Sequence, residues 1–325
     1  MSLLTHELWA RTILAIGALV VVPLALRLVN RRAGTVAKRW SAAQLPSVAA
    51  AVNRLVTVIR LLWLPSALLL SAAQLLSSGP LAAALAAPWL VVTGLVALVG
   101  LARAWRFRRG PLPEFVAACG MIYLAIGGGW ALADRAGIRP LGFEPAIVLL
   151  TAVHFHYAGF ALPILAALAI DGLHKPDAQA RESPSTRQIA VSLAGASGLW
   201  ISLGVIASVP LTAVGITATQ LGWSPLAELI AAWCMSLSGL GVAWLYLQLA
   251  FQPTTARITR ELWVFGALFL ACGMLLSILY GSRSLVPVPW LDIPLMRALH
   301  GTANALGFTV PALAAWSMSK YEFGL

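Results

Sequence analysis

Residues 145–170, PAIVLLTAVHFHYAGFALPILAALAI, decide the class of fold, because they form a long run of mostly apolar side chains. Such a run is long enough to cross a hydrocarbon core of about 30 Å as a helix. Its ionisable rings belong to His154, His156 and Tyr157. Ionisable groups are costly inside a membrane, so the run predicts both a membrane span and a candidate functional site.

The composition of the whole chain agrees with this interpretation. Of the 325 residues, 60% are hydrophobic and 10% are charged, and the mean hydropathy is +0.87. These values exclude an ordinary soluble domain. Because backbone groups in lipid must be satisfied within each helix, we expect an all-α polytopic membrane protein, a single bundle of about nine helices forming one domain over residues 1–325. The expected spans are about 8–28, 56–77, 88–105, 114–133, 145–170, 188–208, 224–250, 262–280 and 293–319.

The net charge of +11 lies mostly in short connectors, which indicates membrane topology rather than nucleic-acid binding. Basic residues follow the first, third, fifth and seventh spans, whereas the connectors 78–87 and 209–223 carry none. This alternation predicts an outer N-terminus and an inner C-terminus, with the first span retained. The stretch 209–223 leaves an error of one span open, and no internal repeat is evident. The inner connectors carry Arg27, Arg31, Arg103, Arg106, Lys175, Arg181, Arg257 and Arg260, and the outer ones contain Arg135, Arg139, Arg283 and Arg297.

The fifth span places its ionisable residues deep in the membrane. With Glu144 in its first turn, His154 lies about 15 Å further along, near the midplane. His154 shares a helix face with Tyr157 but is about 200° from His156. Either the two histidines serve different neighbours, or Gly159 and Pro163 mark a distortion of the helix.

The last span carries a second polar stripe. Asp292 is expected to cap its start, and Arg297, His300 and Asn304 follow at i, i+3 and i+7, on one face. Glu228 opens the seventh span. Spans five, seven and nine run in the same direction, so their polar residues share a depth, as one buried site requires.

Structural alternatives are open for several of these residues. Glu144 and Glu228 are also typical first-turn carboxylates, favoured by the helix dipole. Arg297 can be an interfacial anchor, and His156 can be an interhelical hydrogen-bond donor. Trp233 lies deeper than the interfacial tryptophans, as packing or as a pocket wall.

Two motifs together, HFHYAGF and HGTANALGF, resemble the YndJ-like family of bacterial integral membrane proteins. That family is labelled as transporters, and the resemblance implies a shared His/Asn site. The residues that carry the resemblance are His154, His156, Tyr157, Gly159, Phe160, His300, Gly301, Asn304, Gly307 and Phe308.

We expect an integral-membrane enzyme of the bacterial inner membrane that cyclises or isomerises a hydrophobic, isoprenoid-type substrate without a cofactor. A buried acid protonating an alkene, with aromatic faces stabilising the cation, is the chemistry of a terpene cyclase. The expected partners are this lipid-soluble substrate and membrane lipids, with no nucleic acid. The expected catalytic residues are Glu144, His154, Tyr157, Glu228 and His300, and the expected substrate-binding residues are His156, Trp233, Arg297, Asn304 and Phe308.

Two other functions are open. In a transporter or proton-coupled carrier, Arg297, His300 and Asn304 would bind an anion and the histidines would relay protons. In a metal or haem site, His154 or His156 would act as a ligand together with His300.

Overall fold

The computed structural model describes residues 3–39, 46–174 and 184–319, and all regular structure within these ranges is helical. Proline near the first helical position begins α4, α5, α6 and α9, where its fixed φ favours a helix and its missing N–H costs no hydrogen bond. Gly137 ends α5 with a φ of +71°, a left-handed conformation that glycine adopts without strain. The predicted connector residues Lys175 and Arg181 lie outside the described residues.

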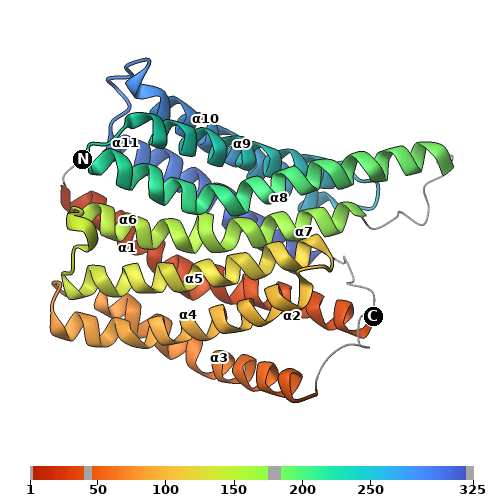
Figure 1. The fold of residues 1–325 in the computed structure, drawn as a ribbon, viewed down its shortest axis with the longest axis horizontal. Helices are drawn as coiled ribbons and strands as arrows, with labels where there is room; N and C mark the ends of the chain where they lie inside the picture. The colour runs from red at the N-terminus through yellow and green to blue at the C-terminus, as the bar shows by residue number, and fades with distance from the viewer. Residues whose placement is uncertain (1–2, 40–45, 175–183, 320–325) are drawn as a thin grey trace. The chain divides into compact units, whose positions relative to one another are not determined.

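The chain divides into two compact units, one formed by residues up to Ile164 and one beginning at Leu165. The first unit contains α1 (Leu3–Ile16), η1 (Gly17–Val21), α2 (Val22–Arg39), α3 (Pro46–Ala73), α4 (Pro80–Phe107), α5 (Leu112–Ala136), η3 (Pro140–Gly142), α6 (Pro145–His154) and η4 (Phe155–Ala161). In this unit α3 packs against α4, α4 against α5, and α5 against α6 and η4 (Figure 1).

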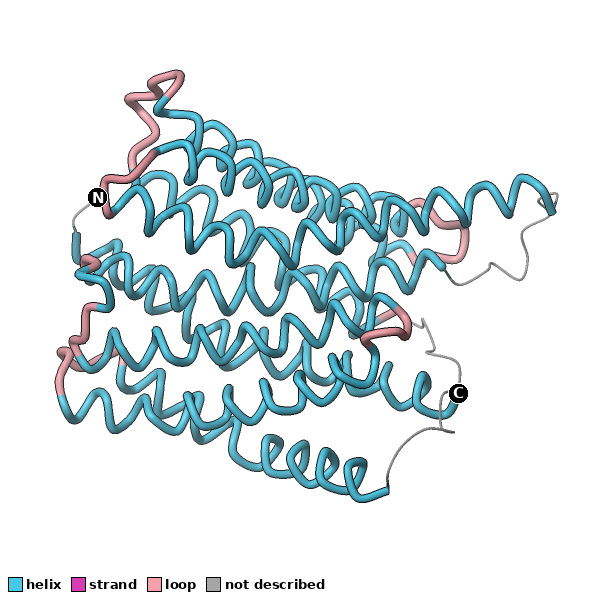
Figure 2. The backbone as a smooth tube through the Cα atoms, in the orientation of Figure 1, coloured by secondary structure: helices cyan, strands magenta, loops and turns pink. Residues whose placement is uncertain are grey.

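The second unit has a corresponding order of helices. It contains most of α7 (Leu162–His174), then α8 (Pro184–Gln220), α9 (Pro225–Ala250), α10 (Arg257–Gly281), η5 (Ser282–Ser284), α11 (Ile293–Met296), η6 (Arg297–Gly301), η7 (Ala303–Thr309) and α12 (Val310–Met318). Here α8 packs against α9, α9 against α10, and α10 against η7 and α12. Figure 2 shows short loops between α4 and α5 in the first unit and between α9 and α10 in the second.

Eight helical stretches of the described chain are long and apolar enough to cross a membrane. They cover Glu7–Arg31, Ala50–Ala73, Pro80–Phe107, Leu112–Ala136, Pro145–Leu173, Ser197–Gln220, Pro225–Ala250 and Arg257–Ser284. The predicted class, an all-α polytopic membrane protein, is therefore confirmed. The ninth predicted span corresponds to α11–α12, whose polar residues reduce its hydropathy. The stretch 209–223 is mostly the end of α8, which runs to Gln220. The predicted orientation of the termini stays a prediction.

Two arginines that were exceptions to the charge alternation have partners. Arg135 is buried at the end of α5, where it pairs with Asp134 at 2.7 Å and donates a hydrogen bond to the Leu76 carbonyl at 3.0 Å. Arg283 pairs with Glu228 at 2.9 Å. Paired side chains of this kind are structural, so they carry less topological information than free connector charges.

The second unit repeats the helix pattern of the first, which corrects the expectation that the chain has no internal repeat. The π-helices η4 and η7 run from Phe155 to Ala161 and from Ala303 to Thr309, so an offset of 148 residues matches both ends. The same offset relates the N-cap residues Glu144 and Asp292. Helices α5 and α10 both contain 25 residues, and α3 and α8 each contain an internal proline.

A short sequence match and two sets of contacts support the repeat. Residues 159–167, GFALPILAA, and 307–315, GFTVPALAA, are identical at six of nine positions. In the first unit, Gly127 of α5 faces His156, and in the second Gly273 of α10 faces Asn304, which is the residue equivalent to His156. The repeat is inconspicuous in sequence because apolar spans tolerate many substitutions of similar volume.

Candidate functional site

His156, in the π-helix η4, has both ring nitrogens in hydrogen bonds. Its side chain is fully buried, and Nδ1 lies 2.7 Å from the Ala152 carbonyl. The indole Nε1 of Trp89 donates to Nε2 at 3.0 Å, and the two rings stack with centroids 5.9 Å apart. A carbonyl only accepts and an indole only donates, so the proton of this neutral imidazole is on Nδ1. The bond links two helices, with His156 as acceptor rather than the expected donor.

Tyr157, next to His156, also bonds another helix. It is 7% exposed, and its hydroxyl donates to the Ile13 carbonyl of α1 at 3.0 Å. His156 and Tyr157 therefore fasten η4 to α4 and to α1. The helix is distorted at this position, because the π-helix η4 replaces regular α-helix from Phe155 to Ala161.

His154 and Glu144, the other two predicted residues of the first unit, lie apart along the helix. His154 is part-buried and packs edge-to-face on the Phe155 ring, with centroids 5.9 Å apart. Glu144 is the exposed N-cap residue of α6, about 15 Å from His154 along the axis. At that separation its carboxylate acts at the helix start and not on the His154 ring.

His300, in η6, forms the central contact of the second unit. Its Nδ1 lies 2.7 Å from the carbonyl of Gly273 in α10, and the amide Nδ2 of Asn304 lies 3.0 Å from its Nε2. The carbonyl places the proton on Nδ1. Asn304 Nδ2 also lies 3.3 Å from that Nδ1, so the amide nitrogen contacts both ring nitrogens. A Cβ at residue 273 would collide with Asn304 Oδ1, so glycine at this position permits the close approach.

The side-chain oxygen of Asn304 has no hydrogen-bond donor in the described part of the chain. Its Oδ1 is buried and accepts no hydrogen bond from the residues that the structure describes. The backbone carbonyl of Asn304 accepts from the Thr309 hydroxyl at 2.8 Å, which holds the π-helical turn. An unsatisfied buried acceptor costs about 1–3 kcal/mol, so this oxygen marks a place where a donor is favoured.

The remaining predicted residues of the second unit fall into two other groups. Both carboxylate oxygens of Glu228 accept from Arg283 Nη2, at 2.9 and 3.1 Å, and Trp233 donates to the Ser282 hydroxyl at 3.0 Å. Phe308 is 1% exposed and packs edge-to-face on Tyr246, with centroids 5.2 Å apart. Arg297 lies in η6, three residues before His300, and is part-buried. Each unit is described by itself, so the predicted convergence of all ten residues stays a prediction.

Arg60 and Gly273 were not predicted from the sequence. Arg60 lies inside the span Ala50–Ala73, and a charge within an apolar run is itself the signal that could have found it. Gly273 has no such signal, because only the packing of α10 shows that it faces Asn304.

These features define a polytopic all-α membrane protein with two related four-helix repeats and polar π-helical segments. The YndJ-like protein family model matches residues 12–308, and the chain belongs to this family. The chain is 29% identical over 228 residues to the uncharacterized membrane protein YndJ of Bacillus subtilis (strain 168). The match covers 70% of this chain but only 37% of that relative. No solved structure matches the chain.

Proposed function

We propose that the protein is a proton-coupled carrier of the bacterial inner membrane, with His300 and Asn304 as its proton-responsive pair. The observation that carries this proposal is the hydrogen-bond contact of Asn304 Nδ2 with the His300 ring, 3.0 Å from Nε2 and 3.3 Å from Nδ1, beside the buried acceptor Asn304 Oδ1. An amide can reverse its donor and acceptor ends, and an imidazole can convert Nε2 from acceptor to donor by taking up a proton.

Proton uptake would reverse this hydrogen bond. When Nε2 of His300 is protonated, the Asn304 amide rotates so that Oδ1 accepts from it. The amide Nδ2 then occupies the side facing Gly273, where Oδ1 was. Uptake of one proton therefore replaces the acceptor Oδ1 by the donor Nδ2 at this buried position. A solute bound through a hydrogen bond to Oδ1 is then released, and one that accepts from Nδ2 is held.

The equivalent position in the first repeat is built differently. His156 Nε2 accepts from the Trp89 indole, which carries a donor and no acceptor. If His156 Nε2 were protonated, its N–H would point at the Trp89 N–H in a fully buried location, and two donors without an acceptor are costly there. The first repeat therefore holds its histidine neutral, and only the second contains a reversible pair.

The internal repeat supports a carrier over an enzyme. Membrane carriers are commonly built from repeats whose interrupted helices supply the binding groups. Arg297, in the same π-helical region as His300, favours an anion as the solute.

The cyclase function stays a prediction that the geometry supports less well. Its acid must be protonated and must face the substrate. Glu228 instead binds the Arg283 guanidinium through both oxygens, and Glu144 is exposed at a helix start.

The carrier proposal is tested in proteoliposomes loaded with a pH-sensitive dye. Under an inside-negative potential, external acetate, succinate or inorganic phosphate should accelerate internal acidification. Asn304→Leu and His300→Gln should abolish this acceleration, whereas Asn53→Leu, at an exposed position of α3, should keep it. Equal rates in all four proteins would contradict the proposal.

A second experiment separates the carrier from the cyclase. Membranes containing the protein are incubated with linear polyprenylated compounds in deuterated water. A product with a carbon-bound deuterium would establish cyclisation and overturn the carrier proposal.

A further inference from the structure

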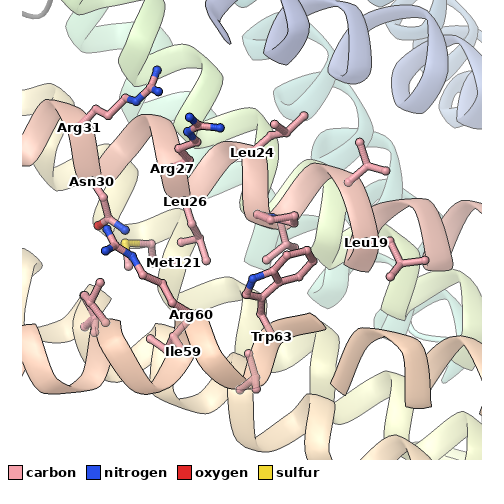
Figure 3. Close-up of a pocket in the computed structure, with 16 residues that line it drawn as sticks. Leu19, Leu24, Leu26, Arg27, Asn30, Arg31, Ile59, Arg60, Trp63 and Met121 are labelled. Atoms are coloured by element: carbon pink, nitrogen blue, oxygen red, sulfur yellow. The ribbon is translucent and has the colours of Figure 1, made fainter. Parts of the chain in front are cut away.

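A cavity of about 790 Å³ lies within the first unit, between the first span and helices α3, α4 and α5. Its volume is within the range of ligand pockets, roughly 300–1,000 Å³. Most of its lining is apolar, with side chains that include Leu19, Leu24, Leu26, Ile59, Val92 and Val99. Figure 3 shows the cavity with its lining side chains.

One part of this cavity is strongly basic. Arg27 and Arg31 of α2 and Arg60 of α3 line it, and no lining residue is acidic. Asn30 lies among them, and its Oδ1 accepts from Arg103 Nη2 at 2.8 Å. In Figure 3 the side chains of Asn30 and Arg60 extend toward one another from facing helices. Arg27, Arg31 and Arg60 are exposed, and a concentration of guanidinium groups without carboxylates attracts an anion.

Arg60 lies within the candidate span Ala50–Ala73, and its side chain is exposed. Arginine in the hydrocarbon region is unfavourable unless it has a polar partner or reaches the interface. Trp63, one turn further along α3, also lines the cavity, so the basic part continues into an aromatic and apolar part.

Helix α3 leaves the cavity accessible from the lipid phase. Only 22% of the Ala50–Ala73 span is buried, the smallest share of the eight candidate spans in the described chain. Leu61, Leu64 and Leu68 on this helix are all more than 40% exposed. A ligand that is itself a lipid therefore reaches the cavity without passing through water.

We propose that this cavity binds one anionic phospholipid, with its phosphate at Arg27 and Arg60 and an acyl chain along the apolar lining. The guanidinium fork matches phosphate oxygens in a bidentate geometry. Basic pockets between membrane helices are known to recognise anionic head groups. A small soluble anion cannot be the complete ligand, since it would contact the arginines and leave the apolar lining of the cavity without a partner. This inference does not depend on the carrier proposal.

The test is native mass spectrometry of the purified full chain with defined lipids. Wild-type protein should retain one phosphatidylglycerol per chain, in preference to phosphatidylcholine with the same acyl chains. The double variant Arg27→Gln/Arg60→Gln should bind phosphatidylglycerol roughly 30-fold more weakly, at about 1 kcal/mol per arginine. Arg54→Gln is the matched control, since Arg54 is an exposed arginine of α3 outside the cavity.

Further arms identify the part of the ligand that is recognised. Leu19→Trp, which fills the apolar part while keeping every arginine, should also weaken phosphatidylglycerol binding. Inorganic phosphate and glycerol 3-phosphate should fail to displace the lipid. Circular dichroism and gel filtration confirm that each variant is folded. Equal lipid binding by the double variant and Arg54→Gln, or displacement of the lipid by inorganic phosphate alone, would overturn the proposal.

Discussion

The amide Nδ2 of Asn304 lies 3.0 Å from His300 Nε2, while Nδ1 of the same ring lies 2.7 Å from the Gly273 carbonyl. This arrangement uses both nitrogens of the imidazole and leaves Asn304 Oδ1 buried against a glycine. The pair therefore depends on the absence of a side chain at residue 273.

Gly273→Ala should destabilise the protein by about 1–3 kcal/mol, because its Cβ would occupy the position of Asn304 Oδ1. Gly127→Ala should have a similar effect, since its Cβ would lie 2.9 Å from His156 Nδ1. Gly129→Ala is the control, because a Cβ there meets no atom within 4 Å, and alanine favours a helix. Thermal unfolding in one detergent measures all three, and equal midpoints would refute the packing argument.

Trp89→Phe should cost about 1–3 kcal/mol, because His156 Nε2 loses its donor inside a fully buried environment. Trp223→Phe, at a position that is 76% exposed, should change the stability little. The comparison is made by denaturant unfolding of the purified variants. If both substitutions had the same effect, the indole-to-imidazole bond would not contribute to stability.

Glu228→Gln tests the role of a predicted catalytic acid. Its partner Arg283 is about one third exposed, so losing the ion pair should cost at most about 1 kcal/mol. A carrier that uses His300 and Asn304 should keep its flux in this variant. Abolished formation of a cyclised product, with the fold intact, would instead identify Glu228 as an acid. Flux and product formation are measured on the same preparation.

Membrane orientation is tested by cysteine labelling in a background without Cys119, Cys234 and Cys272. The charge alternation predicts that Ile138→Cys, between α5 and α6, reacts with an impermeant maleimide in intact cells. Gly110→Cys, between α4 and α5, should react only after the cells are opened. The reverse pattern would place the N-terminus inside.

The bounds of several membrane spans were predictable to within a few residues. The span expected at 145–170 is observed as Pro145–Leu173, and that expected at 224–250 as Pro225–Ala250. The last, expected at 293–319, corresponds to α11–α12, Ile293–Met318. Prolines at helix starts and long apolar runs act locally, so a single sequence contains their signal. The sixth span, expected at 188–208, is instead observed as Ser197–Gln220, because α8 continues through the predicted connector.

The partners of the polar side chains were not predictable in the same way. The predicted directions of His154 and His156 assumed a regular α-helix, but a π-helix begins between them, at Phe155. The donor to His156 comes from Trp89, 67 positions earlier in the chain, and Glu228 has Arg283 as its partner, 55 positions later. Such pairings depend on which helices pack together, and apolar spans encode that weakly.

The membrane-spanning helical class follows from the sequence alone, because burial of backbone in lipid permits little else for runs this apolar. The sequence also marked His156, His300 and Asn304, since polar groups are costly at that depth. The partners of these side chains depend on helix packing, which sets the Trp89 indole against His156 and the Gly273 carbonyl and Asn304 amide against His300. Hydrogen bonding is directional and short in range, so its partners exist only after α4 and η4, or α10 and η6, have packed.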